Sequence, residues 1–289
     1  MDRPMRPDRH ELDRYERVDG FLAEAGDWLV AREAEHNLML GISSNLRDHP
    51  EIFDAPPYLA VVRHDGQIVA AAMRTPPWAL ILSEVDDEAA IDSLVTDLSS
   101  FPVPGVVGPT AAVRRFADRW VSAHGGRAEV AMEERIFRLE RVIPPVPVSG
   151  GMREAGAADR GLLVDWIAAF GREALGDEDA SRVAASVDDW LAGKGRRIWL
   201  WDDDGPVSLT GAGGHTPNGI RIGPVYTPPE RRERGYASAL VAAVSQAHLD
   251  AGQKFCFLYT DLANPTSNRI YQAIGYEPVT DALRIDFRP

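Results

Sequence analysis

The sequence predicts an α/β protein built on a mixed sheet and arranged as two domains. Short apolar segments alternate with amphipathic helical segments from residue 151 to the C-terminus. A chain of 289 residues can form two hydrophobic cores. Residues 142–151, VIPPVPVSGG, interrupt both periodicities and have the composition of a semi-rigid spacer. We therefore expect domains at residues 1–143 and 151–289, joined by a linker at residues 144–150.

The C-terminal half is expected to begin with a short strand and two helices, at residues 152–155, 159–174 and 180–193. Three strands at residues 197–201, 207–213 and 220–226 follow, joined by DDDG and TPNG turns. The next helix carries an apolar stripe that includes Leu240, Val241 and Val244. A buried strand at residues 254–262 precedes a last helix. These elements predict a mixed sheet with helices on both faces.

The N-terminal half shows a weaker version of the same order. Residues 11–36 are expected to be largely helical, and residues 59–63 and 67–74 to form a hairpin. Strands are expected at residues 79–83, 105–108 and 131–139, and helices at residues 88–98 and 110–124. The sequence thus predicts a second, related unit.

Composition limits the functional classes. The chain has 45% hydrophobic and 26% charged residues, as ordinary globular proteins have. A net charge of −13 argues against a general nucleic-acid binder. The single cysteine fits a reducing cytoplasm, and the charged N-terminus has no apolar core of a secretory signal. Since no apolar run reaches the about 20 residues that cross a bilayer, we expect a cytoplasmic protein without membrane attachment.

The most informative segment is residues 225–237, VYTPPERRERGYA. An apolar strand ends at two prolines, and three arginines then precede a glycine and the start of an amphipathic helix. Small residues at Gly235 and Ala237 let a ligand approach the backbone, and the free N–H groups of a helix start favour an anion. Arginine adds charge-assisted hydrogen bonds. The segment therefore predicts a binding site for a diphosphate.

A second segment, ANPTSNRIYQAIGY, follows the strand at residues 254–262. Asn264 suits an N-cap, Pro265 the first helical turn and Gly275 the C-terminal stop. Asn264, Asn268 and Tyr271 are spaced i, i+4 and i+7, so they share one helix face. A tyrosine and two asparagines beside a strand end could line a binding site.

Together these motifs resemble the GNAT acyl-CoA N-acyltransferases, from about Gly151 to the C-terminus, in a tandem arrangement with a degenerate N-terminal half. The resemblance implies a CoA diphosphate held by the arginine turn, and a pantetheine arm along the preceding strand. It implies acetyl-CoA as co-substrate and an amine-bearing small molecule or peptide as acceptor. The cofactor-binding residues that it implies are Val225, Tyr226, Thr227, Arg231, Arg232, Glu233, Arg234, Gly235, Tyr236, Ala237, Ser238, Asn264 and Asn268.

The expected reaction is direct attack of the amine on the thioester. N–H groups near Val225–Thr227 would polarise the carbonyl, and Tyr271 would act as general acid for the leaving thiolate. The general base stays open among His215, Glu173, Asp261 and a water chain. Alternatives are transfer of another acyl group, or a non-enzymatic CoA-binding sensor or assembly module.

The N-terminal half has the acidic segment SEVDDE at residues 83–88 where the C-terminal half has arginines. A carboxylate beside a phosphate would be repulsive, so this half is expected to be structural, substrate-shaping or dimer-forming, and a homodimer is compatible with that. His10, His36, His64 and His124 share no metal-ligand spacing, and no metal is expected. Cys256 alternates with Phe255 and Phe257 and is expected to be an inert core residue.

Overall fold

The computed structural model describes residues 10–174 and 180–289. The chain forms two compact units. Unit 1 comprises Met1–Met39, Phe53–Glu134 and Thr280–Pro289, and unit 2 comprises Leu40–Ile52 and Arg135–Val279. This division differs from the single cut expected at residues 144–150. The proline-rich segment lies wholly in unit 2, and each half of the sequence contributes a segment to the other half's unit.

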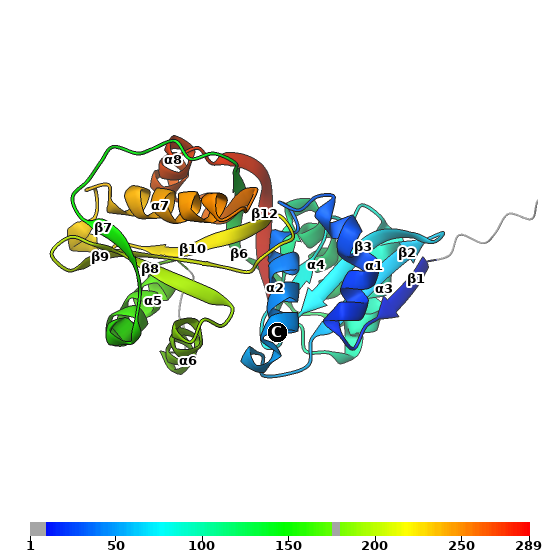
Figure 1. Cartoon of the computed structure of the whole chain (residues 1–289). Helices are drawn as coiled ribbons and strands as arrows, with labels where there is room; N and C mark the ends of the chain where they lie inside the picture. The colour runs from blue at the N-terminus through cyan, green and yellow to red at the C-terminus, as the bar shows by residue number, and fades with distance from the viewer. Residues whose placement is uncertain (1–9, 175–179) are drawn as a thin grey trace, which may run out of the picture. The chain divides into compact units, whose positions relative to one another are not determined.

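The two halves of the sequence have the same order of elements: strand, two helices, three strands, helix, strand, helix and strand (Figure 1). The N-terminal half contains β1 (His10–Arg14), α1 (Val18–Val30), α2 (Asn37–Asp48), β2 (Tyr58–His64), β3 (Gln67–Arg74), β4 (Leu80–Leu82), α3 (Glu88–Asp97), β5 (Gly105–Pro109), α4 (Thr110–His124) and β6 (Arg127–Leu139). The C-terminal half contains β7 (Gly151–Glu154), α5 (Arg160–Ala174), α6 (Ala180–Leu191), β8 (Arg196–Asp202), β9 (Pro206–Gly213), β10 (Gly219–Tyr226), α7 (Tyr236–Asp250), β11 (Phe255–Asp261), α8 (Pro265–Ala273) and β12 (Glu277–Arg288).

Unit 1 is built on the strand order β1-β2-β3-β4-β5-β12. Its pairs are antiparallel except for β4 with β5, which are parallel. Alternate residues of β2, including Ala60 and Val62, join α3 and α4 in one hydrophobic cluster. That alternation is what a strand with a buried face requires.

Unit 2 has the strand order β6-β11-β10-β9-β8-β7, with helices on both faces of the sheet (Figure 1). One cluster joins Ile220 and Ile222 of β10 to α7 and α8. The other joins Ile198 and Leu200 of β8 to α5 and α6. The two clusters define an α7/α8 face and an α5/α6 face, as the sequence predicted.

The last strands of the two halves are exchanged. Residues 282–286 of β12 pair antiparallel with β5 from the N-terminal half, and β6 lies next to β11 from the C-terminal half. Each half therefore completes its sheet with a strand from the other half. β12 was not among the expected elements. Its backbone groups are satisfied by pairing with β5, and the sequence pattern does not reveal that pairing.

Most of the expected elements are confirmed, and the main error lies near the N-terminus. The sequence predicted a largely helical segment over residues 11–36, but its first part is β1. Of these five residues only Leu12 is apolar, so β1 depends on its antiparallel pairing with β2. Helix α2 was missed because its Gly, Ser and Asn residues give it low helix propensity.

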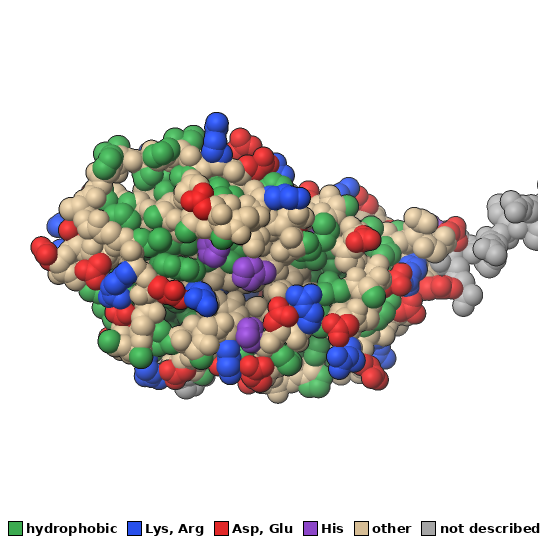
Figure 2. All heavy atoms as spheres, viewed as in Figure 1, with side chains coloured by type: hydrophobic (Ala, Val, Ile, Leu, Met, Phe, Trp, Pro, Cys, Tyr) green, Lys and Arg blue, Asp and Glu red, His purple; other side chains and the backbone are tan. Residues whose placement is uncertain are grey.

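Figure 2 shows acidic and basic side chains interspersed over one face, without a continuous basic area. None of the helices in the described residues is long and apolar enough to cross a membrane.

Candidate functional site

The candidate site begins where two parallel strands stop pairing. β10 pairs with β11 only through residues 219–221, which face residues 255–257, although both strands continue beyond this point. On its other edge β10 shifts register against β9 between Ile222 and Val225. Peptide groups of β10 beyond Arg221 are thus available on the β11 side. An extended ligand could pair with them as a third strand would.

The arginine turn leads from the end of β10 into α7. Gly235 is the N-cap of α7 and has a φ of +83°, a conformation that favours glycine. No side chain caps this helix start. A Cβ added at Gly235 would also come within 3.0 Å of a methyl group of Val148. The first N–H groups of α7 are therefore available to an anion, with little room for a larger residue at the cap.

The three arginines of the turn are engaged differently. Arg232 donates from Nε to the Thr227 carbonyl oxygen at 2.9 Å, and from Nη2 to Glu173 Oε2 at 2.6 Å. Among the described residues, Arg231 and Arg234 have neither a hydrogen bond nor an ion pair with a side chain. Two guanidinium groups beside the uncapped helix start are thus available to a ligand, and the third is shared with Glu173.

Other expected site residues have structural contacts of their own. Tyr236 is buried and donates to Asp203 Oδ2 at 2.5 Å. This hydrogen bond, with a second one from Ser149, lowers the pKa of Asp203. Tyr226 is also buried, and its carbonyl oxygen accepts from Ser208. Glu233 has a φ of +61° within the turn. Tyr226 and Tyr236 therefore hold the strand end and the helix start in place.

Helix α8 carries Asn268 and Tyr271 and begins after Asn264. Asn264 is its N-cap and accepts from the Ser267 N–H at 3.1 Å. Asn268 donates to the carbonyl oxygens of Asp261 and Asn264 and accepts from Thr260. Both asparagines therefore stabilise the connection between β11 and α8, a role that the sequence did not separate from ligand binding.

Tyr271 is buried on α8, with 8% of its surface exposed. Its ring packs edge-on against Tyr276 at 6.1 Å between centroids. Its hydroxyl has no hydrogen-bond partner among the described residues. Burial raises the pKa of Tyr271 well above its ordinary value, so the phenol is protonated throughout the physiological range. Tyr276, in contrast, has its hydroxyl 2.9 Å from Ser245 Oγ.

The three base candidates lie in different surroundings. Glu173 is an ion-pair partner of Arg232 at the turn. Asp261 caps the β11–α8 turn, because its Oδ1 accepts from the Ala263 N–H at 2.7 Å. His215 follows the end of β9; its side chain is exposed, and partial desolvation lowers its pKa although the charge of Asp48 opposes this. His215 directly follows Gly214, and a Cβ on Gly214 would be 3.6 Å from Nη2 of Arg221, near the start of β10. Of the three candidates, only His215 has a neighbour in this position.

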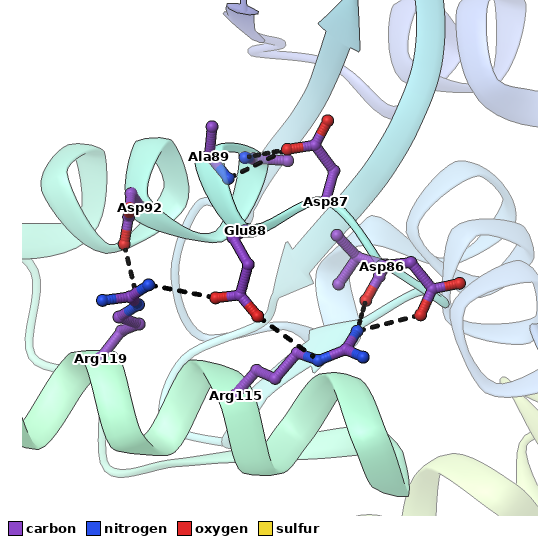
Figure 3. Close-up of polar contacts among 9 residues, drawn as sticks. Asp86, Asp87, Glu88, Ala89, Asp92, Arg115 and Arg119 are labelled. Carbon is purple, nitrogen blue, oxygen red and sulfur yellow. Dashed lines mark hydrogen bonds and ion pairs between the residues drawn. The ribbon is translucent and has the colours of Figure 1, made fainter.

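The corresponding helix start in the N-terminal half is already occupied. Asp87 caps α3 by accepting from the N–H groups of Ala89 and Ala90 (Figure 3). The neighbouring acidic residues Asp86 and Glu88 form ion pairs with Arg115 and Arg119 of α4 (Figure 3). The backbone donors that are free at α7 are therefore satisfied by a carboxylate at α3.

Two groups of residues were not found from the sequence. His10 and His64 are partners in the β1–β2 register, and both contact Asp87 Oδ2, at 2.8 and 3.1 Å. Their possible ligand atoms lie within 4.8 Å of one another, although the residues have no metal-ligand spacing in sequence. The second group, Arg196 and Arg221, comes together only through the strand register.

Comparison with known proteins identifies the fold. Residues 206–285 match the family model described as FR47-like protein. The whole chain resembles a Drosophila protein of solved structure, with a TM-score of 0.70 at 14% identity, over 96% of this chain and 98% of that one. It also resembles a GCN5-related N-acetyltransferase from Sphaerobacter thermophilus, with a TM-score of 0.60 at 17% identity, over 98% and 97%.

A tandem GNAT protein from the clavulanic acid biosynthesis pathway is also similar, with a TM-score of 0.57 at 14% identity, over 96% and 97% of the two chains. No match was found among curated proteins. The predicted resemblance is confirmed: the protein has the fold of the GNAT acetyltransferases. The repeated order of its elements is that of two GNAT-like halves in tandem.

Proposed function

We propose that the protein is an N-acetyltransferase that transfers the acetyl group of acetyl-CoA to a primary amine. The observation that carries this proposal is the junction of three features in unit 2. These are the end of pairing between β10 and β11, the uncapped start of α7 behind Gly235, and the hydroxyl of buried Tyr271, which has no protein partner among the described residues. Each feature would contact a different part of a thioester that carries a diphosphate.

Acetyl-CoA fits the donors that the site offers. Arg231, Arg234 and the first N–H groups of α7 would bind the diphosphate, with Arg232 released from Glu173 as a third cation. The available edge of β10 would pair with the amide groups of the pantetheine arm. Gly235, Ala237 and Ser238 keep the helix start narrow enough for close approach. Asn264 and Asn268 would hold the α8 side of the site in position.

The donors to the thioester carbonyl are proposed to lie earlier in β10 than residues 225–227, where the sequence suggested them. Pairing with β11 ends at Arg221, so a pantetheine arm that starts near Thr227 would reach the end of the opening near Ile222. The six residues from Ile222 to Thr227 are separated by five steps and span about 17 Å in an extended strand. Pro224 has no N–H, so the Gly223 and Val225 N–H groups are the nearest donors to polarise the thioester carbonyl.

Tyr271 would donate a hydrogen bond to the sulfur as the C–S bond breaks. With its pKa raised by burial, the phenol is a weaker acid than the thiol, whose ordinary value is about 8.5. Full proton transfer would therefore be uphill, and stabilisation of the developing thiolate by the O–H group is the larger contribution. Tyr271 then needs no ionisation in the working pH range.

The acceptor amine loses its proton to His215 or to a water chain that ends there. Glu173 and Asp261 are less suited to this role because their carboxylates already serve Arg232 and the β11–α8 turn. The acidic start of α3 supports one acetyl-CoA site per chain, with a structural role for the N-terminal half. A cytoplasmic location remains our expectation, since the single cysteine fits a reducing compartment.

An acetylation assay with a panel of amines tests the proposal. Free CoA thiol is measured with acetyl-CoA and, in parallel, with longer acyl-CoAs. We expect turnover with acetyl-CoA that falls about 100-fold in Tyr271→Phe, the usual size of a general acid or donor contribution. Faster turnover with a longer acyl-CoA would mean that the transferred group is that acyl group and not acetyl. Tight CoA binding without turnover on any amine would favour a sensor or assembly module instead.

A further inference from the structure

Two arginines outside the acetyl-CoA site point to the same face of the unit 2 sheet. Ile198 of β8 faces α5 and α6, and Arg196, two residues earlier, shares that direction. On β10, Ile220 and Ile222 face α7, so Arg221 between them points to the opposite, α5/α6 face. Neither arginine is near the other in sequence, and only the fold brings them to one surface.

The strand between them presents glycine. Arg196 and Arg221 both have Gly213 of β9 as their register partner, so the three residues form one row across the sheet. Two strand spacings separate the arginine Cα atoms by about 10 Å. A Cβ on Gly211, on the same face, would be 2.8 Å from Arg196 Cδ and 2.9 Å from the Gly223 carbonyl oxygen. The glycines therefore leave space that the Arg196 side chain partly crosses.

Arg196 has no acidic partner to balance its charge. Its Nε is buried without a hydrogen-bond partner, and among the described residues no carboxylate forms an ion pair with it. Its guanidinium lies 5.3 Å from the centre of the Trp190 ring. Burial, and then the positive charge of Arg221, lower the pKa of Arg196 to about 9.

Arg196 as a whole is partly exposed, but its Nε is buried. A partly desolvated cation beside a second cation is unfavourable, and arginine does not relieve this by losing its proton. An anion placed between the two guanidinium groups would be attracted to both of them. Guanidinium groups also match the geometry of a carboxylate through paired N–H donors. The arrangement therefore has the charge and the shape of a site for a small carboxylate.

The position relates this site to the proposed reaction. Arg221 is the last residue of β10 that pairs with β11, next to Ile222, where the pantetheine arm is expected to end. A carboxylate bound near Arg221 would hold an amine of the same small molecule close to the thioester. On the opposite, α7/α8 face of the sheet, Tyr271 belongs to the same hydrophobic cluster as Ile222.

We propose that Arg196 and Arg221 bind the carboxylate of the acceptor, and that the acceptor is an amino acid or another amine with a carboxylate close to its amino group. The amine rests on the proposed acetyltransferase function, whereas the carboxylate site does not. Acceptors that lack an anionic group would leave the charge of Arg196 unbalanced and would bind weakly.

Matched acceptors test this inference. Each common amino acid is compared with its own carboxamide by release of CoA thiol from acetyl-CoA, using the full-length protein. For the preferred amino acid we expect kcat/KM to exceed that of its amide by about 10-fold or more, as loss of a charged hydrogen-bond partner implies. Arg196→Gln and Arg221→Gln should remove most of this preference by raising KM for the acid, with little change for the amide. Arg197→Gln is the control, because Arg197 is exposed on the same strand and pairs with Glu154.

Equal use of acid and amide by the wild type, or an unchanged preference in Arg196→Gln, would overturn the inference while leaving the acetyltransferase intact. If no amine is acetylated, the same amino acids are titrated calorimetrically into the protein with CoA present. A heat of binding that is seen in the wild type and lost in Arg196→Gln would support the carboxylate site and argue against the acetyl transfer. No heat from any amino acid would overturn the site itself.

Discussion

The role of Glu173 can be decided by a single substitution, Glu173→Gln. In the structure Glu173 holds Arg232 at 2.6 Å, while Arg232 also donates to the Thr227 carbonyl oxygen. A diphosphate bound at the turn must compete with this carboxylate for the guanidinium. Glutamine keeps the size of the side chain but removes the charge. Glu173→Gln should therefore make acetyl-CoA bind more tightly, whereas loss of a catalytic base would lower turnover.

The expected size follows from exposure. The Arg232 and Glu173 side chains are 44% and 46% exposed, so solvent screens the pair. Exposed ion pairs contribute about 0.2–1 kcal/mol. If that is the free energy that the diphosphate must overcome, its removal should lower the Kd for acetyl-CoA about 1.4- to 5-fold. Arg232→Gln should act in the opposite direction and weaken binding by on the order of 10-fold, since a charge-assisted hydrogen bond is lost.

Calorimetric titration of acetyl-CoA and a pH profile of kcat/KM between about pH 6 and 9 measure both effects. Glu230→Gln is the matched control, because Glu230 is an exposed carboxylate of the same turn that forms no hydrogen bond or ion pair with Arg232 among the described residues. Equal tightening in both variants would indicate a general charge effect. If turnover falls by about 100-fold or more in Glu173→Gln and an ionisation disappears from the profile, our reasoning is refuted and Glu173 is the base.

Substitutions at three further positions test other parts of the structure. Tyr271→Phe should change the Kd for acetyl-CoA less than about threefold while kcat falls, because its hydroxyl has no protein partner among the described residues; a matched loss of binding would contradict this. Arg196→Leu should raise the free energy of unfolding by on the order of 1 kcal/mol, since removal of the partly desolvated charge outweighs the Trp190 contact of about 0.5–1 kcal/mol. A lower thermal midpoint would show that Arg196 is compensated in the free protein. Asp87→Ala should cost about 1–2 kcal/mol through the lost cap of α3, whereas Asp87→Asn should keep most of it, as denaturant titration would show.

The Asp87 contribution should also depend on pH. Burial tends to raise the pKa of Asp87, but the hydrogen bonds from His10 and from the α3 N–H groups outweigh it and leave the pKa lowered. A lowered folded-state pKa means that the stabilisation is fully present above the unfolded value of about 3.9 and is lost as the pH falls through the folded value. The difference in unfolding free energy between wild type and Asp87→Asn should therefore shrink below about pH 4. A difference that stays constant down to about pH 2 would contradict the assignment.

The sequence predicted the fold where periodicity and turn residues agree. Helix α8 is the clearest example, because Asn264, Pro265 and Gly275 mark its ends and the observed cap confirms them. The prediction was wrong at β1, because a strand with one apolar residue out of five depends on pairing with its neighbour β2. The exchange of β6 and β12 between the two halves could not be predicted from the sequence, because the residue pattern of each strand is compatible with either sheet.

For the candidate site, local order was predictable and long-range register was not. The arginine turn and the α8 face involve residues that are close in sequence. The pairing of Arg232 with Glu173 joins the turn to α5, and the row through Gly213 joins three strands. Alternation within one strand gives the face of a side chain, but only the register shows which side chains meet.

The most direct test of the central claim is the stoichiometry of acetyl-CoA binding. Calorimetric titration should give one site per chain, and binding should be weakened by about 10-fold or more in the double variant Arg231→Gln, Arg234→Gln. Removal of the α4 arginines in Arg115→Gln, Arg119→Gln should leave the affinity unchanged, because α3 is capped by Asp87. Absence of binding, or binding that survives the loss of Arg231 and Arg234 but not of Arg115 and Arg119, would contradict the account.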